Sequence, residues 1–494
     1  MATISALEAK VGHPRYVRDP IHGDIELSPL EAAVVDSRQF QRLRYIRQNG
    51  LLHFIFPGAV HTRFAHSLGA FALSKRAFAQ LVSPLVPVHE GELQDQLEYL
   101  GTVFRLAALL HDVGHCAFSH SIEHVEIEGK PFFGTLETFL TQMGQVDLLE
   151  DLRSSAADVE IGKLPTKHEH ISLVLVRRIF ENSSVRKRTS ASEDLARDIA
   201  ALIDGTLKPS ERFAAAAQSF ATGLQTHAAI DFVMSDSLPS QILSVLHALI
   251  SGTVDVDRLD YLVRDSLHCG VPYGKCEVEF LLKSIRIGAV AGLPALILDN
   301  KARYALEDML WSRYQLFVQV LNHKTNVALN SALRVALEEA VEDVRIEMPD
   351  TEPKLLAFTD DYVMSKIHRV AMAGKLSERS YTKALIDRRF PLHLDVLELV
   401  KIPVEDRERA VSERVRQLAS ELGVAETVVT IGRATSKIIK ENPLYLQSWN
   451  RRKQKYEEPV PFEYSSIQGP LEHVVVHFFA DRDTLPGHQR SDAS

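Results

Sequence analysis

His111 and Asp112 are the residues with the clearest potential for metal chemistry. They close an apolar run that begins at Thr102, and Gly114 and His115 follow at once. Adjacent residues on a helix point about 100° apart, so both can bind one ion only where a helix ends or is distorted. Gly114 offers a place for such a break. The pair therefore marks a candidate metal site at the end of a helix.

Two residues far away in the sequence complete this candidate site. His66 and Asp257 each lie on an amphipathic helix of their own. With His111 and Asp112 they make two imidazoles and two carboxylates, a set that leaves positions open for water and a substrate oxygen. Such ligands suit Mn, Fe, Co or Mg better than a closed structural zinc site. A cation of this kind activates water and polarises a phosphoryl oxygen, so the expected reaction is hydrolysis of a phosphate ester.

Thiolate ligands are not expected, because the chain has only three cysteines and no CxxC pair. Histidines near the motif could supply the proton that a leaving oxygen needs, since imidazole titrates in the useful range. The candidates are His115, His120 and His168. Each of them could instead be an ordinary, partly buried histidine with a backbone partner, and the sequence alone leaves both interpretations open.

The helix that begins near Asp257 carries more polar residues than a core helix needs. Asp257 and Tyr261 share a face at i and i+4, with Asp265 one turn further along. A structural ion-pair network is the alternative for its remaining charged residues, which are Arg258, Asp260 and Arg264. Downstream, positive charge for phosphates is available on another expected helix from Arg313, His323 and Lys324.

The net charge of -9 argues against binding of nucleic acid without sequence preference, because such binding needs a broad positive field. An anionic ligand must then meet a local cluster of positive charge. One candidate cluster consists of Arg38, Arg42, Arg44 and Arg47. A solvated helix face is an equally good interpretation of the same spacing.

Most of the chain reads as helix, because apolar residues recur every three or four positions. The first expected helix is capped by Ser37 and ends at Gly50. The apolar faces of the expected helices carry, in chain order, Phe40, Leu43 and Ile46; Phe64, Leu68 and Phe71; Val103 to Leu110; and Val256, Leu259 and Val263. Polar stretches at 182–194 and 349–354 are predicted to be loops.

The composition, with 45% hydrophobic and 24% charged residues over 494 positions, is that of a folded protein with a large core. We predict a mainly α fold with a helical catalytic domain at 1–345 and a smaller α+β domain at 346–480. Strand candidates in the second domain are Thr427 to Gly432 and Glu472 to Phe479. The tail at 481–494 is predicted to be disordered. No run of about 18 apolar residues and no leader-like start is present, so we expect a cytoplasmic protein without membrane contact.

Five motifs occur in order along the first two thirds of the chain, between Arg15 and Asn326. They are Asp19-Pro-Ile-His-Gly23, the segment from Gln39 to Gln48, Phe56-Pro-Gly-Ala, the segment from His61 to Gly69, and the segment from His111 to His120. Together they resemble the HD-domain dNTP triphosphohydrolases, without the sterile alpha motif that some members carry. The resemblance implies a helical HD phosphohydrolase core and water attack at the α-phosphorus, which releases a deoxynucleoside and triphosphate.

The resemblance also implies roles for individual residues. The implied metal ligands are His66, His111, Asp112 and Asp257. The implied catalytic residues are Asp112, His115 and His168, of which the two histidines contact phosphates, and His120, which protonates the leaving 5′ oxygen. The implied substrate-binding residues are Arg63, Arg258, Tyr261 and Arg313 at the phosphates, and Gln48 and Asp265 at the sugar.

A regulatory site is implied as well. Asp36, Gln41 and Arg44 match positions that read guanine, and Arg15 stands where a lysine contacts phosphate, so the resemblance implies activation by GTP or dGTP in a homo-oligomer, a dimer or a tetramer. Two departures bear on selectivity. Asn49 replaces an apolar residue beneath the sugar, and Leu321 replaces a tyrosine that crowds the ribose edge.

Two other functions stay open at this point. One is a different HD phosphohydrolase that acts on another nucleotide or on the ends of single-stranded nucleic acid, an interpretation that the altered sugar positions and the arginine cluster favour. The other is a nucleotide-sensing oligomer whose catalysis is vestigial, and the presence of all four metal ligands counts against it. For the C-terminal domain we expect a role in oligomerisation or regulation.

Overall fold

The computed structural model describes residues 14–88, 91–123, 125–127, 130–155, 160–344, 346, 348–372, 385–388, 390–400, 402–437, 444–450, 455–462, 472–480 and 485. Helices dominate them and the sheets are small, so the predicted mainly α fold is confirmed. Apart from 485, the predicted disordered tail lies outside the described residues. Among the described helices, none is both long and apolar enough to cross a membrane.

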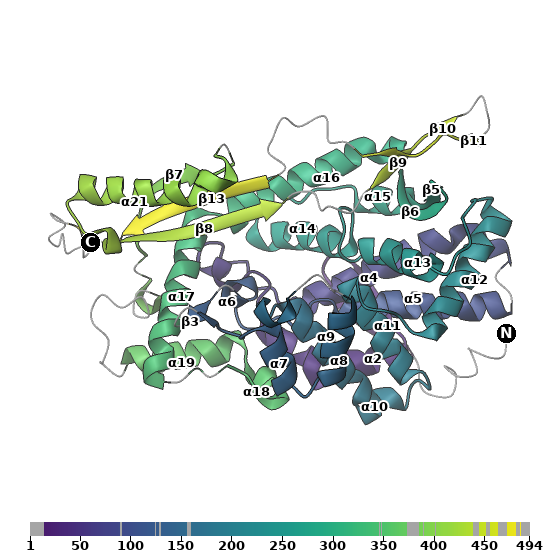
Figure 1. Ribbon diagram of the computed structural model, residues 1–494, viewed down its shortest axis with the longest axis horizontal. Coiled ribbons are helices and arrows are strands. Elements are labelled where there is room, and N and C mark those ends of the chain that lie inside the picture. The colour runs from purple at the N-terminus through teal and green to yellow at the C-terminus, as the bar shows by residue number, and fades with distance from the viewer. Residues whose placement is uncertain are drawn as a thin grey trace.

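The helices follow one another closely along the chain (Figure 1). Those of the first half are α2 (Pro29–Val35), α3 (Arg38–Gln41), α4 (Arg63–Val82), α5 (Glu92–Leu110), α6 (His120–Glu123), α7 (Leu136–Gln142), α8 (Val146–Ser155), α9 (His168–Glu181), α10 (Ser183–Arg186), α11 (Ser192–Asp204), α12 (Glu211–Ala228) and α13 (Leu238–Ala248). Those of the second half are α14 (Val256–Cys269), α15 (Val278–Ser284), α16 (Arg303–Leu316), α17 (Lys324–Val344), α18 (Glu352–Ala357), α19 (Asp360–Met372) and α21 (Arg407–Leu422).

The strands form small sheets at the edges of the helical body. Two hairpins are β1 (Arg15–Asp19) with β2 (Gly23–Leu27) and β3 (Glu126–Ile127) with β4 (Lys130–Pro131). A four-stranded sheet has the order β12 (Val460–Pro461), β9 (Tyr445–Gln447), β6 (Leu293–Asp299) and β5 (Ile285–Val290), and a short pair joins β10 (Trp449–Asn450) to β11 (Lys455–Tyr456). A three-stranded antiparallel sheet has the order β7 (Leu392–Glu398), β13 (Glu472–Ala480) and β8 (Val429–Lys437).

Three helices position the candidate metal site. The helix α4 packs against both α5 and α14. Phe64, Leu68 and Phe71 lie on the buried face of α4, as the spacing predicted. Two ends are well defined: α5 stops at Leu110, directly before the candidate ligands, and the side chain of Asp255 caps α14 by accepting from the Arg258 backbone. The predicted helix break after the apolar run is therefore confirmed.

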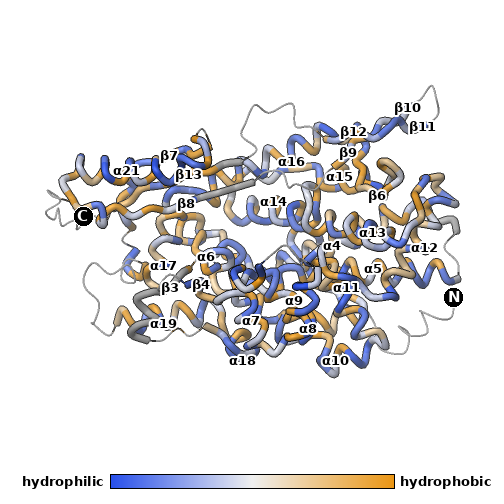
Figure 2. The backbone as a smooth tube through the Cα atoms, viewed as in Figure 1, coloured by the Kyte–Doolittle hydropathy of each residue, from blue (hydrophilic) through white to orange (hydrophobic). Residues whose placement is uncertain are grey.

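Polar residues lie inside the molecule on α14. Figure 2 shows much of this helix in blue although neighbouring helices surround it. Its buried residues include Arg258, Asp260, Arg264 and Asp265 beside Val256 and Leu259. The predicted inward position of Val263 is only half right, since Val263 is half-buried and Leu262 fills the core position. Buried charge on this scale has to be matched by partners, and those partners belong to the site described below.

The predicted helix from Ser37 to Gly50 is wrong in extent. Ser37 does cap a helix, but α3 ends at Gln41, a 3-10 turn covers Arg42–Tyr45, and the chain is extended at Ile46. The backbone at 46–48 pairs instead with 61–63, because Arg63 N donates to Ile46 O at 2.9 Å and Gln48 N to His61 O at 3.0 Å. These non-local hydrogen bonds override the local helical pattern, whose apolar residues are nevertheless all buried.

The two predicted loops are partly helical. Within 182–194, the Asn182 side chain accepts from Ser184 N at 3.0 Å and starts α10, and α11 begins at Ser192. Within 349–354, α18 begins at Glu352. Polar residues that resemble a loop in sequence thus include helix caps.

The C-terminal third contains both predicted strands: Glu472 to Phe479 lies within β13, whereas the strand predicted from Thr427 begins only at Val429, as β8, because a 3-10 turn covers Glu426–Val428. With α21 and β7 they enclose a small apolar cluster that includes Val411, Leu418, Val476 and Phe478. Between β8 and β13 the chain returns to the helical body, where β9 pairs in parallel with β6. The division of the chain at residue 345 stays a prediction.

Candidate metal centre and active-site pocket

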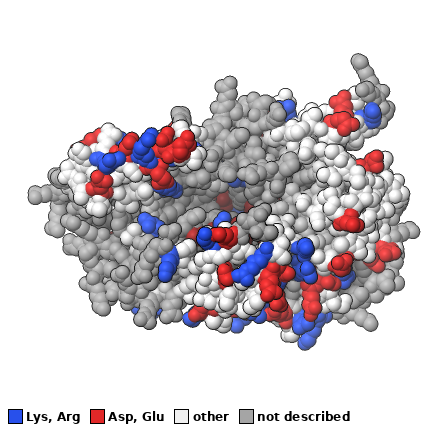
Figure 3. Space-filling model, viewed as in Figure 1, with Lys and Arg blue, Asp and Glu red and all other residues white. Residues whose placement is uncertain are grey.

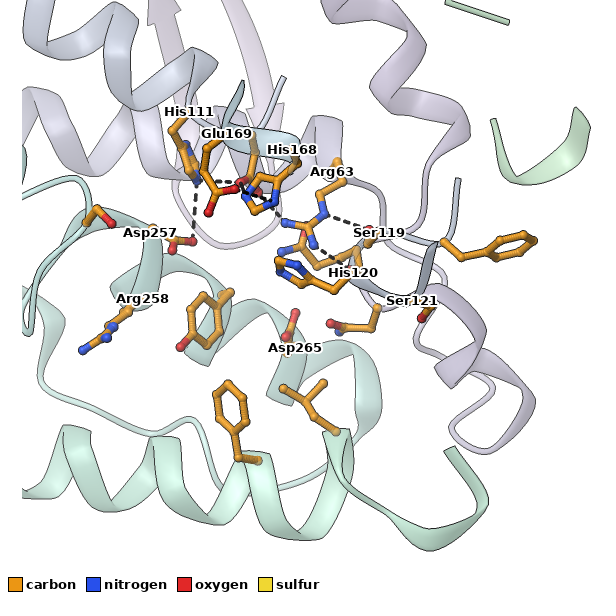
Figure 4. Close-up of a pocket in the computed structure, with 18 of the residues that line it drawn as sticks. Arg63, His111, Ser119, His120, Ser121, His168, Glu169, Asp257, Arg258 and Asp265 are labelled. Atoms are coloured by element: carbon orange, nitrogen blue, oxygen red, sulfur yellow. Dashed lines mark hydrogen bonds and ion pairs between the residues drawn. The ribbon is translucent and has the colours of Figure 1, made fainter. Parts of the chain in front are cut away.

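The structure brings the four predicted metal ligands together. His66 Nε2 lies 3.0 Å from Asp257 Oδ1 and 3.5 Å from Asp112 Oδ2. His111 Nε2 lies 3.3 Å from Asp112 Oδ1 and 3.7 Å from Asp257 Oδ1. Figure 4 shows His111 and Asp257 facing each other across the site. Donor atoms delivered by α4, by the end of α5 and by α14 therefore converge at one point.

The donor set fits a divalent cation. His66 Nδ1 is hydrogen-bonded to Asp260 Oδ2, and His111 Nδ1 to the Ala108 carbonyl, each at 2.8 Å. The Nδ1 atom of each ring is thus hydrogen-bonded on the side away from the carboxylates. The Nε2 atoms, which face the carboxylates, are buried without a hydrogen-bond partner among the described residues. Two imidazole lone pairs directed at carboxylate oxygens match the ligands of an open metal site.

Charge on these groups reflects their mutual contacts. Burial opposes a proton on His66, but Asp257 and Asp260 outweigh it and raise the pKa of this imidazole to about 10. Burial would raise the pKa of Asp112 and Asp257, yet the neighbouring histidines, together with Arg63 at Asp112, hold both well below the usual range. A cation bound at Nε2 would have to displace the proton of His66.

Close packing explains Gly114. A Cβ on this residue would lie 2.1 Å from the His168 carbonyl oxygen and 2.3 Å from Ser172 N. Ser172 on α9 also accepts from Gly114 N at 2.9 Å and donates to the His111 carbonyl at 2.8 Å. The glycine thus lets α9 press against the turn that carries His111 and Asp112.

The three candidate proton-transfer histidines form a second cluster beside the ligands. The rings of His115 and His168 stack at 3.7 Å, and the His120 ring lies edge-on to both. Glu123 joins two of them, with Oε1 2.7 Å from His168 Nδ1 and Oε2 3.2 Å from His120 Nδ1. For His120 and His168 the partner is therefore a carboxylate rather than the backbone.

Glu123 also separates the charge states of the stacked pair. Burial lowers the pKa of His168, but Glu123 outweighs it and raises that pKa to about 9. The pKa of His115 falls well below its usual range because of burial and because Arg63 and His168 are close. Near neutral pH the pair therefore carries a single positive charge, on His168.

A cavity of about 490 Å³ opens beside both clusters. All six predicted substrate-binding residues line it, namely Gln48, Arg63, Arg258, Tyr261, Asp265 and Arg313. The two positions that depart from the family pattern, Asn49 and Leu321, line it as well. His66 and His115 do not line the cavity and lie buried behind it.

Positive charge in the cavity comes from buried arginines. Arg63 pairs with Asp112 through NH1, donates to Ser119 Oγ at 3.0 Å, and donates to the Gln48 carbonyl at 3.2 Å. Arg258 and Arg313 lie on facing helices and are 1% and 8% exposed. These guanidinium groups form the local positive cluster that an acidic chain needs to hold phosphates.

The four arginines between 38 and 47 do not form one such cluster. Arg42 is buried and donates to the Val113 carbonyl at 2.6 Å, whereas Arg38 and Arg44 are exposed and Arg47 is half-buried. Neither a common anion site nor a uniformly solvated face describes them. Arg42 instead supports the turn that follows Asp112.

The predicted regulatory residues lie in pairs on the surface. Arg15 NH1 contacts both carboxylate oxygens of Asp36 at 2.8 Å. Gln41 accepts from Arg44 Nε at 2.8 Å and donates to the Val35 carbonyl at 2.8 Å, next to Asp36. The Arg44 guanidinium also stacks over the Phe64 ring at 3.6 Å.

Several contacts of the site were missed in the sequence. Glu123 connects His120 and His168, His61 Nε2 lies 2.7 Å from Asp265 Oδ1, and Asp260 contacts His66. The i and i+3 spacing of His120 and Glu123 on a helix could have indicated the first contact. The other two join residues that are distant in sequence, and no local signal indicates them.

Comparisons with known proteins give relatives but no family model that matches the chain. The bovine protein named deoxynucleoside triphosphate triphosphohydrolase SAMHD1 (Bos taurus) is 25% identical over 337 residues, 67% of this chain and 48% of that protein. The human protein of the same name (Homo sapiens) is 44% identical over 112 residues, 22% of this chain and 16% of that protein. The chain spans about half the length of such curated relatives.

A likeness to solved structures covers nearly the whole chain. The crystal structure of a phosphohydrolase from Bacteroides thetaiotaomicron superposes with a TM-score of 0.60 at 21% sequence identity, covering 95% of this chain and all of that one. At this identity the likeness shows the fold alone.

Proposed function

Proceeding from the homology of this chain to proteins named deoxynucleoside triphosphate triphosphohydrolases, we propose that it is a metal-dependent phosphohydrolase that cleaves a dNTP into a deoxynucleoside and triphosphate. One observation carries the proposal: His66, His111, Asp112 and Asp257 converge beside a cavity lined by buried arginines. Homologues that share two thirds of the chain carry the name of this activity.

The cation, when bound to these four residues, would lower the pKa of a water molecule and polarise a phosphoryl oxygen. Mn, Fe, Co and Mg suit this ligand set. Arg63, Arg258 and Arg313 hold the triphosphate by charge-assisted hydrogen bonds. His168, which Glu123 keeps protonated, contributes a further positive charge. His115 lies behind the cavity, stacked on His168, and its lowered pKa keeps it neutral near neutral pH, so it supports the His168 ring without adding charge.

The proposed bond changes are simple. The oxygen of water attacks the α-phosphorus and releases a proton to solvent, the bond from phosphorus to the 5′ oxygen breaks, and the leaving oxygen receives a proton from the protein. We assign that proton to His120, because its ring is exposed at the cavity and Glu123 orients it through Nδ1. The products are then a deoxynucleoside and intact triphosphate.

The sugar would lie between Gln48 and Asp265, with Asn49 and Leu321 close by. A second candidate substrate class is favoured by Asn49, whose Nδ2 is buried without a hydrogen-bond partner among the described residues. An amide donor at the sugar can accommodate a hydroxyl that an apolar residue would reject. Ribonucleoside triphosphates or other nucleotides are therefore the alternative substrates for the same chemistry.

Regulation by nucleotide is part of the proposal. Arg15, Asp36, Gln41 and Arg44 would bind an activating GTP or dGTP at an interface of a homo-oligomer, a dimer or a tetramer. Their paired, exposed arrangement supports this role, because a guanine edge can replace the present side-chain contacts at little cost. The C-terminal region, with α21 and its sheet, would contribute to assembly.

Chromatography of reaction products tests the proposal directly. The full chain is incubated with each dNTP and each NTP, with Mn²⁺ or Mg²⁺, and with and without GTP. We expect a nucleoside and triphosphate, with dNTPs turned over faster than NTPs. Release of a monophosphate with pyrophosphate, or no turnover under any of these conditions, contradicts the proposed reaction. Faster turnover of NTPs would favour the second candidate.

A further inference from the structure

Asp260 is a fully buried carboxylate that lies directly behind the candidate ligand His66. Its Oδ2 is 2.8 Å from His66 Nδ1, and its Oδ1 is 2.7 Å from His22 Nε2. Arg264 adds a bidentate contact, with Nε 2.8 Å from Oδ2 and NH2 2.9 Å from Oδ1. Two imidazoles and one guanidinium thus share a single carboxylate, which is more than a simple ion pair needs.

The second imidazole, that of His22, comes from the N-terminal part of the chain. His22 lies in the turn of the β1–β2 hairpin, and Asp19 fixes this turn by accepting from Ile21 N and His22 N, each at 2.9 Å. The other oxygen of Asp19 accepts from Arg264 NH1 at 3.0 Å. The motif from Asp19 to Gly23 is therefore joined to α14 by contacts that converge on Asp260.

The fold leaves no free space around this network. A Cβ on Gly69 of α4 would lie 1.9 Å from Asp260 Oδ1 and 2.4 Å from Arg264 NH2. Glycine at this position lets α4 approach α14 closely enough for His66 to reach the carboxylate. The positions of Gly69, His66 and Asp260 consequently depend on one another.

The chemistry of a carboxylate determines the proton positions. An ionised carboxylate only accepts hydrogen bonds, and the bidentate guanidinium of Arg264 matches Asp260 in that form. Both rings must then donate to it. His66 therefore carries a hydrogen on Nδ1, and Nε2, which faces Asp112 and Asp257, is the nitrogen that binds a cation once the cation has displaced its proton.

We propose that Asp260, with His22 and Arg264 around it, positions His66 for the metal, so that the N-terminal hairpin sets the affinity of the centre for its cation. The inference rests on the metal centre of the proposed function, though not on its substrate. Partners that fix the tautomer and orientation of a ligating histidine also raise its basicity.

The two histidine ligands differ in this respect. His111 donates to the carbonyl of Ala108 in its own helix, a neutral acceptor. His66 donates to a charged acceptor that is itself held by two other groups, His22 and Arg264. We therefore expect the affinity of the site for its metal to depend strongly on the groups around His66. A network that served only to join the hairpin to α14 would not change this affinity.

Mn²⁺ affinity of the full-length, chelator-stripped protein tests the inference, measured by electron paramagnetic resonance without nucleotide. For Asp260→Asn we expect a Kd raised by about 10- to 100-fold, the usual cost of losing such a partner. For His22→Ala we expect a smaller rise. His22→Gln should restore part of the affinity, because its amide can still donate to Asp260.

Asp198→Asn is the matched control. Asp198 is also a fully buried carboxylate, and it accepts from Tyr99 Oη at 2.5 Å and Ser210 Oγ at 2.8 Å, away from the site. This substitution should lower Tm and leave the Mn²⁺ Kd unchanged. The inference is overturned if folded Asp260→Asn and His22→Ala bind Mn²⁺ like the unmutated chain.

Three further outcomes are informative. If Asp260→Asn does not fold, the comparison of His22→Ala with His22→Gln decides, and equal affinities of these two variants overturn the inference. If the protein binds Mn²⁺ but hydrolyses no dNTP, the proposed function fails while this inference stands. No binding of Mn²⁺ by the unmutated chain removes both.

Discussion

Two stacked imidazoles beside the pocket differ strongly in their affinity for a proton. The rings of His115 and His168 are too close for both to be charged, since like charges at 3.7 Å disfavour each other strongly in a buried site. Glu123 contacts His168 at 2.7 Å and so decides which ring is protonated. His168, which lines the cavity, can therefore present its charge to a phosphate oxygen, while His115 stays neutral behind it.

Glu123→Gln should lower the pKa of His168 from about 9 toward its ordinary value. His168 is charged below this pKa and loses its proton as the pH rises through it, so the loss of activity at alkaline pH should begin at lower pH in the variant. The stabilising contact with Glu123 is likewise present at low pH and lost as the pH rises through about 9. A profile of kcat/KM against pH measures the shift.

Glu169→Gln provides the comparison for that profile. Glu169 is half exposed and lies 3.3 Å from the same nitrogen of His168, so its removal should move the alkaline limb less. Equal profiles for the Glu123→Gln variant and the unmutated protein would contradict the assigned role of Glu123.

Asp257→Ala removes a predicted ligand and should reduce turnover by more than about 100-fold, since losing even an outer partner of a ligand costs 10- to 100-fold. Bound metal, measured by mass spectrometry, should fall with it, whereas the helical circular dichroism signal should persist. Asp308→Ala changes an exposed aspartate and serves as the control. Retained activity with stoichiometric metal would show that the site lies elsewhere.

Among single residues, the sequence could predict those whose type and position together indicate metal binding. Histidine next to aspartate at the end of an apolar run indicated His111 and Asp112, and the same reasoning led to His66 and Asp257. Glu123, His61 and Asp260 could not be selected, because a carboxylate on an amphipathic helix usually faces solvent and a single histidine has many uses. Their roles depend on contacts that only the folded chain creates.

Among the elements, the turn after His115 is held by a helix from the C-terminal part of the chain. Phe118 and Ser119 have φ values of 59° and 54°, a region that costs a non-glycine residue about 1–3 kcal/mol. The buried Asp360 at the start of α19 accepts from Phe118 N at 2.8 Å and from Arg47 N at 3.0 Å. This carboxylate thereby stabilises the backbone that carries His120.

Asp360→Asn should reduce kcat by about tenfold with normal metal content, because an amide offers one acceptor where two N–H groups need one each. Burial raises the pKa of Asp360 to about 6 despite these donors. Protonation therefore favours the folded chain as the pH falls through about 6, while one donor loses its acceptor. Activity should decline there without a fall in Tm from this group.

The difference between the pH profiles of the two proteins measures this effect. The limb near pH 6 should be weaker or absent in Asp360→Asn, and Asp361→Asn, which changes the exposed neighbour, should retain it. Identical kcat values for the Asp360→Asn variant and the unmutated protein would contradict a positioning role.

Helices with strong apolar periodicity could be predicted, and α4, α5 and α14 are where the pattern placed them. The segment after Ser37 could not, since the backbone hydrogen bonds that end its helix early come from residues 61–63. The π-helical turn Phe317–Leu321, which puts Leu321 in the cavity, has no sequence signal either.

At the scale of the molecule, charges of both signs are interspersed rather than separated on the face that Figure 3 shows. Figure 3 shows basic and acidic residues side by side over α21 and over helices on the lower part of the visible face. The positive charge directed at phosphates is instead buried, on Arg63, Arg258 and Arg313. Affinity for nucleotides should therefore depend on the pocket, and binding to oligonucleotides should be weak.

Arg15→Ala tests nucleotide activation. The pair of Arg15 and Asp36 is exposed and contributes at most about 1 kcal/mol to stability, so its loss should leave the fold intact. We expect GTP stimulation of dNTP hydrolysis, and any GTP-dependent assembly seen by mass photometry, to be lost. Arg18→Ala breaks a more exposed pair, with Asp24, at another residue of the same strand and should retain both. Equal stimulation of the two variants would argue against the predicted site.

The metal ligands lie on α4, at the end of α5 and on α14, and the residue that supports His66 is also on α14. A nascent chain that has not yet released α14 from the ribosome lacks both Asp257 and Asp260, so it can hold a cation only weakly. Loading with metal must accordingly follow synthesis of at least the first half of the protein, and a firmly held ion reports that distant parts of the polypeptide have docked.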